Sequence, residues 1–189
     1  MVGDLPKSVI IDGEEWDIRT DYRDILKVLL AFNDPNIENA EKIFICLKVI
    51  YEGFSEMPEE EYEIAFREAI RFIDYDLPES KRKGRNIRMM DWEQDGNMLF
   101  AALNKVAGRE IRSLEYLHWW TLMGYFMEIP TDGVFGSVLR LRQKKHSGKK
   151  QLDKAEKEFW SNNRELCEIK PKLSDEEKAA KERLKKLLM

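Results

Sequence analysis

Twelve consecutive uncharged residues separate Glu115 from Glu128, and this run sets the strongest limit on what the chain can fold into. It reads YLHWWTLMGYFM, with two adjacent tryptophans, two tyrosines, a phenylalanine and a histidine. A helix that crosses a bilayer needs about 20 apolar residues, so the run is too short for a membrane span. A helix that is apolar nearly all round is usually central and buried. The sequence therefore predicts a buried helix at residues 111–129.

The composition of the 189-residue chain favours a helical core. Hydrophobic residues make up 43% and charged residues 36%, which is enough apolar material for a folded domain. The chain has only 10 glycines and 6 prolines, so long helices are favoured over many short strands. Cys46 and Cys167 form no Cys-x-x-Cys pair, which indicates free, buried thiols in a reducing compartment. The N-terminus does not resemble a signal peptide, so we expect a cytoplasmic protein.

Charge is distributed unevenly along the chain. Residues 1–80 carry 20 acidic and 8 basic side chains, net −12, whereas residues 81–189 carry 16 acidic and 24 basic ones, net +8. Such a chain can associate head to tail or bind an oppositely charged partner. The two halves can also neutralise each other within one fold, and this is the interpretation we favour.

Hydrophobic periodicity predicts one hairpin followed by a series of helices. Asp12–Gly13 lies between two short apolar runs and is typical of a tight turn, which predicts a hairpin at residues 8–18. Helix starts are expected at Asp34–Pro35 and at two capping boxes, Asp91 to Gln94 and Ser174 to Glu177. Apolar residues at helical spacing predict helices over 22–32, 35–52, 58–73, 92–107, 111–129, 131–147, 152–169 and 174–189.

We therefore expect a mainly α fold, a helical bundle of about six to eight helices with a short N-terminal β-hairpin. Residues 1–148 are expected to form the helical core domain with the hairpin. Residues 149–189 are expected to form a charged C-terminal helical arm with sparse apolar anchors. Residues 74–90 contain a proline, a glycine and five basic side chains, and they are a candidate hinge.

Candidate catalytic and metal-binding residues are few, and they are isolated from one another in the sequence. His118 and His146 share no metal-ligand spacing with a cysteine or carboxylate, and we interpret His118 as a hydrogen-bonded core residue. Asp74 and Asp76 form a D-x-D pair, but they follow a helix instead of a nucleotide-binding strand. Three further acids are interpreted as helix-start residues: Asp91, Glu93 and Asp95. We predict no catalytic residue, no metal site and no cofactor, and so a protein that is not an enzyme.

Two basic runs, at residues 81–88 and 140–150, are candidates for phosphate contacts with nucleic acid. The isoelectric point is about 5.5, however, and no helix-turn-helix, zinc or RNP signature lies beside them. Solvated linkers or acidic protein partners therefore fit these runs better than nucleic acid does.

Aromatic and leucine side chains on the predicted helices are candidates for partner binding. Trp119 and Trp120 point about 100° apart on a helix, so at least one packs on a second surface. We favour the core for both, with an interface as the alternative, because aromatic anchors dominate interface energetics. The candidate partner-binding residues are Trp119, Trp120, Phe159, Trp160, Leu184, Leu187 and Leu188.

Residues 91–130, DWEQDGNMLFAALNKVAGREIRSLEYLHWWTLMGYFMEIP, closely resemble the phage gene-product-fifteen family of long-tailed phages and prophages of Gram-positive bacteria. The D-W-E-Q-D start, the N-K-V-A-G turn and the E-Y-L-H-W-W-T segment carry the resemblance. The N-terminal VIIDGEEWDIRTDYRDIL and the K-x-E-K-E-F-W segment after the basic stretch extend it over nearly the whole chain.

The resemblance implies a non-enzymatic protein of tail morphogenesis in the cytoplasm of the bacterial host. Members of the family are typically encoded among tail genes, near the tape-measure gene, as tail-assembly chaperones are. A chaperone of this kind coats the tape-measure protein, recruits tail-tube subunits and is absent from the mature virion. The expected partners are the tape-measure protein and the tail-tube protein, with association between copies as a further option, and no membrane. Two alternatives stay open, a structural subunit of the finished tail and a nucleic-acid-binding phage regulator.

Overall fold

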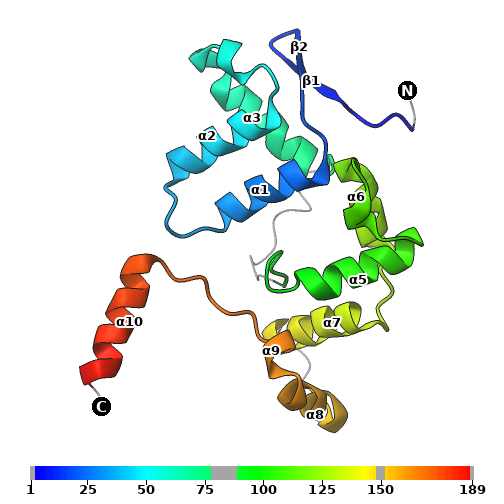
Figure 1. Ribbon diagram of the computed structural model, residues 1–189, viewed down its shortest axis with the longest axis vertical. Helices are drawn as coiled ribbons and strands as arrows, with labels where there is room; N and C mark the ends of the chain where they lie inside the picture. The colour runs from blue at the N-terminus through cyan, green and yellow to red at the C-terminus, as the bar shows by residue number, and fades with distance from the viewer. Residues whose placement is uncertain (1–2, 78–88, 148–151, 188–189) are drawn as a thin grey trace. The chain divides into compact units, whose positions relative to one another are not determined.

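The computed structural model describes residues 3–77, 89–147 and 152–187 of the chain (Figure 1). It confirms a mainly helical fold with an N-terminal hairpin. The chain forms two compact units: unit 1 comprises residues 1–73 and 170–189, and unit 2 comprises residues 74–169. These bounds differ from the expected division at residue 148, because residues 152–169 pack within unit 2. The first boundary falls at the start of the candidate hinge, of which residues 78–88 lie outside the described part.

Unit 1 begins with an antiparallel hairpin of β1 (Ser8–Ile11) and β2 (Glu14–Asp17). The turn residues Asp12 and Gly13 have φ angles of 46° and 92°. Two positive φ angles in a two-residue turn match the right-handed twist of the flanking strands, which explains the choice of Asp-Gly. The predicted hairpin is therefore confirmed. Ile11 at the end of β1 is fully buried, so the hairpin contributes to the core of unit 1.

The helices of unit 1 are α1 (Tyr22–Phe32), α2 (Asn39–Ile50), α3 (Tyr62–Ile73) and α10 (Asp175–Leu187), with 3-10 turns η1 (Phe54–Glu56) and η2 (Glu59–Glu61) before α3. Figure 1 shows α1 and α2 side by side. The helix start predicted at Asp34–Pro35 is wrong. Asp34 instead accepts a hydrogen bond from the Asn36 N–H at 2.8 Å, which stabilises a loop and delays α2.

Tyr51, the residue after α2, connects the hairpin side of unit 1 to α3. Its backbone forms a β-bridge with Ile18, and its hydroxyl donates to the Ala65 carbonyl at 2.8 Å. Its ring meets the ring of Trp16 edge-on, with 6.5 Å between centroids. The core of unit 1 also contains buried apolar side chains from α1, α2 and α3: Ile25, Val28, Cys46, Leu47, Ile50, Ala69 and Phe72.

The start of α10 confirms the predicted capping box at Ser174. The Ser174 N–H donates to Glu177 Oε2 at 2.8 Å, and the Glu177 N–H donates to Ser174 Oγ at 3.1 Å. The Asp175 N–H donates to Asn36 Oδ1 at 2.9 Å, which attaches the helix to the loop between α1 and α2. Every residue of α10 is exposed.

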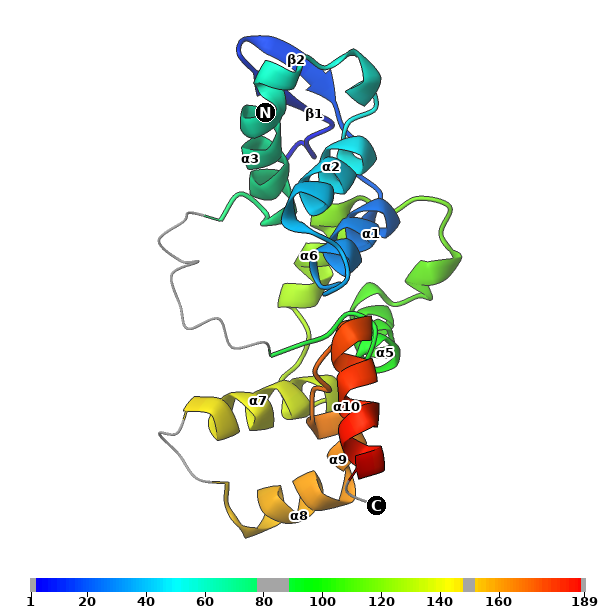
Figure 2. The ribbon, with the colours of Figure 1, turned by 90° about the vertical axis from the view of Figure 1, so that its left-hand side faces the viewer.

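Unit 2 contains α5 (Gly96–Ala107), α6 (Trp119–Met127), α7 (Val134–Ser147), α8 (Lys154–Asn162) and α9 (Arg164–Cys167), with a 3-10 turn, η3 (Ile111–Ser113). Gly108 ends α5 with a left-handed φ of 68°, a conformation in which glycine commonly ends helices. Figure 2 shows α7 and α8 lying beside each other. Val138 and Leu141 on α7 and Cys167 on α9 form a buried apolar cluster, against which partly buried side chains of α8 pack.

The continuous helix predicted at residues 111–129 is wrong over its first half. Glu110 accepts a hydrogen bond from the Arg112 N–H and starts the short turn η3. Residues 114–117 are not helical, and α6 begins only at Trp119. His118 precedes it with extended backbone angles, and its Nδ1 accepts from the Trp120 N–H at 3.0 Å. Side chains that bond to nearby backbone groups compete with the helix, which explains the break.

Candidate functional site

Arg142 on α7 and Asp95 at the start of α5 form a buried ion pair in unit 2. Their side chains are 1% and 0% exposed. Arg142 Nη1 donates to Asp95 Oδ2 at 2.6 Å, and Nη2 donates to Oδ1 at 2.8 Å. The planar guanidinium presents two parallel N–H groups that match the two oxygens of a carboxylate. The pair therefore has the geometry of a bidentate ion pair.

The other N–H groups of Arg142 bond to backbone carbonyls. Nε donates to Cys167 O at 3.0 Å, Nη1 to Met89 O at 2.9 Å, and Nη2 to Leu166 O at 2.6 Å. A guanidinium has five N–H groups, so all five have an acceptor here. The side chain thereby connects α7 to α9, to the start of α5 and to the segment before α5. A buried charge pair is tolerated only when its hydrogen bonds are satisfied in this way. We call Arg142 and Asp95, with these carbonyls, the arginine clamp.

The D-W-E-Q-D stretch provides the clamp with its carboxylate. Asp91 Oδ1 accepts from the N–H groups of Glu93 and Gln94, at 2.9 and 2.7 Å, which folds the stretch into a turn. The Asp91 N–H donates to Asp95 Oδ2 at 2.9 Å. The predicted capping box is therefore right in its first bond only, since Asp95 takes the return bond expected of Gln94. Gln94 Nε2 instead donates to Glu168 O at 2.6 Å, at the end of α9.

Aromatic side chains pack around α6 on one side of the D-W-E-Q-D turn. Trp119 is 2% exposed, and its ring centroid lies 5.9 Å from that of Trp92. Trp92 in turn lies 6.4 Å from Phe126. Trp120 is half-buried, with its ring 5.0 Å from that of Tyr75. The core position that we favour for Trp119 is confirmed, and Trp119 offers little surface to a partner.

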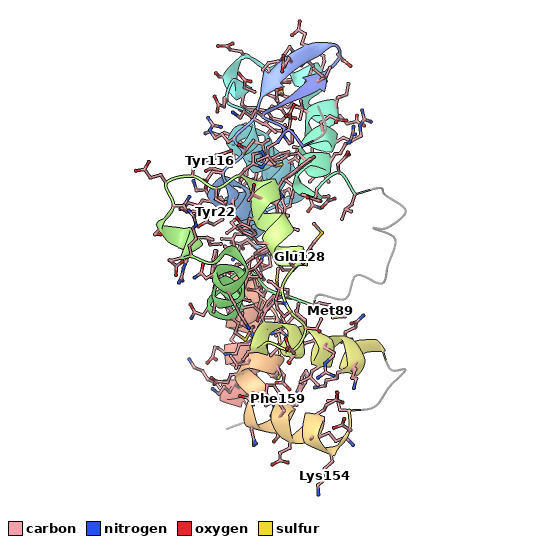
Figure 3. All side chains as sticks on the ribbon, turned by 90° about the vertical axis from the view of Figure 1, so that its right-hand side faces the viewer. Tyr22, Met89, Tyr116, Glu128, Lys154 and Phe159 are labelled. Carbon is pink, nitrogen blue, oxygen red and sulfur yellow. The ribbon has the colours of Figure 1, made fainter. Side chains whose placement is uncertain are left out.

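Phe159 and Trp160 on α8 pack partly against the apolar cluster of α7 and α9. Lys145 Nζ lies 4.0 Å from the centroid of the Trp160 ring, a cation–π contact that holds α8 beside α7. Figure 3 labels Phe159 and Lys154 on this helix. Both aromatic residues are half-buried, so they anchor α8 while leaving part of each ring accessible.

A cavity of about 400 Å³ lies beside the turn between α6 and α7. Gly136 makes the turn compact, since a Cβ at this position would lie 2.5 Å from the Pro130 carbonyl oxygen and 2.7 Å from Thr131 Cα. The cavity is mostly apolar, with Arg140 and Gln143 as its charged and amide groups. The lining residues are Met89, Phe126, Ile129, Thr131, Phe135, Gly136, Leu139, Arg140 and Gln143.

Comparison with known proteins places this architecture in a family. The family model described as Bacteriophage Gp15 protein matches residues 1–169. The chain belongs to the Bacteriophage Gp15 protein family. The match includes the hairpin, the D-W-E-Q-D turn, the aromatic helix and the arginine clamp, and it ends before α10. The resemblance seen in the sequence is thereby confirmed. No curated protein and no solved structure matches the chain.

The predicted partner-binding residues of this Gp15-family protein fall in both units. Trp119, Trp120, Phe159 and Trp160 lie in unit 2, on α6 and α8. Leu184 and Leu187 lie on α10, at 58% and 83% exposed. Leu188 lies outside the described residues. Leu184 and Leu187 are therefore the most accessible of the predicted residues that the structure describes.

Arg140, Lys144 and Lys145, from the described part of the second basic run, form ion pairs within unit 2. Arg140 Nη1 lies 3.7 Å from Glu156 Oε1, and Lys144 donates a hydrogen bond to the same oxygen. Lys145 Nζ lies 3.9 Å from Glu168 Oε1. The hydrogen bond from Lys144, with that from the Asp153 N–H, lowers the pKa of the Glu156 carboxyl below its ordinary value. The first basic run, at residues 81–88, lies outside the described residues.

The structure describes both histidines, both cysteines and the candidate acidic residues. Within residues 3–77, 89–147 and 152–187, no three His, Cys, Asp or Glu side chains group as metal ligands. His118 is buried and hydrogen-bonded, as expected, and His146 is exposed. Both cysteines are unbridged and fully buried, which raises the pKa of the Cys46 thiol to about 12. Over the same described ranges, no helix combines the length and the apolarity that a membrane crossing needs.

The arginine clamp cannot be recognised from the sequence pattern. That pattern places Asp95 at a helix start and Arg142 in a basic run. A local signal for Arg142 exists, because it follows the buried Leu141 and lies four residues after the buried Val138, on the inner face of α7. The sequence holds no comparable signal that pairs it with Asp95, 47 residues away.

Proposed function

We propose that this phage protein is a non-enzymatic tail-assembly chaperone that binds the tape-measure protein in the host cytoplasm. The observation that carries the proposal is the exposed apolar stripe of α10. Leu184 and Leu187 lie on a helix whose residues are all exposed and, apart from Ala179 and Ala180, are otherwise charged. An amphipathic helix of this kind binds by laying its apolar stripe into a groove of its partner.

The start of α10 is fixed in a way that suits such a binding helix. Isolated helices of this length are marginal in water. The capping box at Ser174 and the bond from the Asp175 N–H to Asn36 stabilise its first turn and attach it to unit 1. A preformed helix loses less conformational entropy when it binds than a disordered segment does.

The tape-measure protein is the proposed partner because members of the family are typically encoded among tail genes, near the tape-measure gene. A tape measure is a long, helix-rich chain with apolar seams, and many copies of a short amphipathic helix can cover such seams. The non-enzymatic assignment is supported by the polar groups of unit 2, since Arg142, Asp95 and Gln94 are engaged in bonds that hold the fold together.

The test is co-expression with the neighbouring tape-measure protein, followed by affinity capture and native mass measurement. We expect a soluble complex with several copies of the chain per tape measure. Leu184→Glu combined with Leu187→Glu is expected to abolish it, because two charges would have to enter the apolar groove. Val134→Glu is the matched control, since Val134 is 60% exposed on α7 in unit 2.

Two results would reject the proposal. One is the absence of any complex when both proteins are soluble. The other is the presence of the chain in purified virions at stoichiometric amounts, which would make it a structural subunit of the tail. If the double leucine variant still forms the complex, the tape-measure protein remains the partner, but the contact does not involve Leu184 and Leu187 of α10.

A further inference from the structure

A row of aromatic side chains lies on the surface of unit 1. Phe44 on α2 meets Phe54 in η1 edge-on, with 5.3 Å between ring centroids, and Phe54 lies 5.4 Å from Tyr62 at the start of α3. Phe44 is 47% exposed, and its neighbour Ile43 is 37% exposed. The row is therefore open to solvent, although aromatic side chains of this size contribute most when they are buried.

The segment that contributes Phe54 and Tyr62 to this row is strongly acidic. Between Lys48 and Arg67 the chain has no basic residue and six glutamates, at positions 52, 56, 59, 60, 61 and 63. Glu59 and Glu60 are exposed in η2, between the aromatic residues Phe54 and Tyr62 in sequence. We call Ile43, Phe44, Phe54, Tyr62 and the glutamates at positions 59–61 the acidic aromatic face.

One carboxylate oxygen of this face lacks a hydrogen-bond donor among the described residues. Glu61 Oε2 is shielded from solvent and has no hydrogen-bond partner among the described residues. Desolvation, together with the negative charges of Glu14, Asp12 and Glu60, raises the pKa of the Glu61 carboxyl above its ordinary value. A positive charge placed near this carboxyl would relieve the repulsion from the neighbouring acidic side chains.

Aromatic rings beside carboxylates form a surface that suits arginine and lysine. A guanidinium can stack on a ring while its N–H groups bond to a neighbouring carboxylate. One cation already adopts part of this arrangement, since Lys48 Nζ lies 5.8 Å from the centroid of the Phe44 ring. The chemistry of the face therefore fits a basic segment rich in arginine.

The chain itself contains such a segment. Residues 81–88, KRKGRNIR, carry five cations in eight residues. The described cations of the second basic run are already held by Glu156, Glu168 and Asp95. We propose that the acidic aromatic face docks residues 81–88 of a second copy of the chain. The net charges of −12 before residue 81 and +8 from it onward favour this head-to-tail contact.

The contact joins two different surfaces, so it is heterologous. A heterologous contact that does not close into a ring adds copies one after another. The inference is independent of the proposed chaperone role, because it concerns association of the chain with itself and needs no tape measure.

Sedimentation velocity of the full-length protein, over a range of concentrations, tests the proposal. We expect concentration-dependent association at about 0.05 M salt and its loss at about 0.5 M salt, because salt screens exposed charges. Glu59→Lys with Glu60→Lys is expected to raise the dissociation constant at least about tenfold, as it places cations against cations. Glu115→Lys with Glu128→Lys changes the net charge equally at exposed positions in unit 2 and is expected to leave association nearly unchanged.

A mixing experiment identifies the occupant. Lys81→Ser, Arg82→Ser and Lys83→Ser together are expected to give a chain that no longer associates with itself. This triple variant keeps the acidic aromatic face, and the Glu59→Lys, Glu60→Lys variant keeps the basic run. Mixed together, the two variants are expected to form a heterodimer, because one productive contact remains between them. Circular dichroism of each variant confirms that it is folded.

Three results would overturn the proposal. The wild-type chain could stay monomeric at low salt at all concentrations, which would exclude a second copy as the occupant. Association could be equally strong in the Glu59→Lys, Glu60→Lys variant, which would exclude the face. Association could persist in the triple variant, which would exclude residues 81–88.

Discussion

Arg142 and Asp95 meet through two parallel hydrogen bonds, Nη1 to Oδ2 at 2.6 Å and Nη2 to Oδ1 at 2.8 Å, in the interior of unit 2. Replacing Arg142 by methionine would leave the Asp95 carboxylate buried without a cation and three carbonyls without a donor. Removing one partner of a buried pair costs about 3–5 kcal/mol, and we expect a loss of stability in this range. Urea unfolding followed by tryptophan fluorescence measures it, since four of the five tryptophans lie in unit 2.

The control for this change is Arg140→Met on the same helix. Arg140 is 54% exposed, and Glu156 keeps Lys144 when it is removed. An exposed ion pair contributes at most about 1 kcal/mol, so we expect a much smaller loss. Equal losses for the two arginines would show that the clamp contributes little to the stability of unit 2.

Local backbone and side-chain hydrogen bonds account both for the parts of the fold that the sequence predicts correctly and for the parts that it predicts wrongly. The Asp12–Gly13 hairpin and the Ser174 capping box are right because each depends on residues within a few positions of each other. The same kind of local bond accounts for the errors at Asp34 and His118. Each side chain has an alternative backbone partner two residues ahead, and hydrophobic spacing does not reveal which partner is used.

Hydrophobic periodicity does not predict the contacts of the site that join residues far apart in the sequence. Arg142 and Asp95 are 47 residues apart, and each has a plausible local role, as a member of a basic run or of a helix start. The cavity beside Gly136 likewise depends on how the Pro130–Thr131 turn returns onto α7. The burial of Trp119 was predictable, since a run without charges must be covered.

Gly136 and Gly124 both lie in helices, but replacing each by alanine is predicted to change the stability of the protein in opposite directions. A Cβ at Gly136 would lie 2.5 Å from the Pro130 carbonyl oxygen, so the turn would have to move. We expect Gly136→Ala to destabilise the protein by about 1–3 kcal/mol, the usual cost of overpacking. A Cβ at Gly124 on α6 meets nothing within 4 Å, so Gly124→Ala is expected to stabilise by up to about 1 kcal/mol. Thermal unfolding of both variants tests this, and the same sign for both would contradict the prediction.

His118 is expected to stabilise α6 through its cap. Its Nδ1 accepts from the Trp120 N–H at 3.0 Å, and its side chain is 2% exposed. Both His118→Ala and His118→Asn remove the buried ring, but asparagine is a good N-cap and alanine is not. We expect the asparagine variant to be more stable than the alanine variant by about 0.5–2 kcal/mol in urea unfolding. If the two are equally stable, the cap is not what His118 contributes.

Glu110 gives the protein a predictable response to acid. Its Oε1 accepts from Arg112 Nε at 2.7 Å and from the Arg112 N–H at 3.0 Å, and its Oε2 accepts from Arg112 Nη2 and Asn104 Nδ2, each at 2.8 Å. These bonds, chiefly those from Arg112, lower the pKa of Glu110 from 4.5 to about 2. A depressed carboxyl pKa stabilises the folded state above the unfolded pKa, and this stabilisation is lost as the pH falls through the folded pKa. The stability difference between the wild type and Glu110→Gln should therefore be constant above about pH 5 and vanish towards pH 2.

Carbon-13 NMR of the Glu110 carboxyl measures the same effect directly, with an expected midpoint well below 4.5. Arg112→Gln is the control variant, because it removes the guanidinium that accounts for the largest part of the shift. The Glu110 midpoint should then move upward towards 4.5, while the backbone N–H of residue 112 and Asn104 keep part of the effect. A midpoint that is near 4.5 in the wild type, or that does not respond to Arg112→Gln, would show that the Glu110–Arg112 pair does not persist in solution.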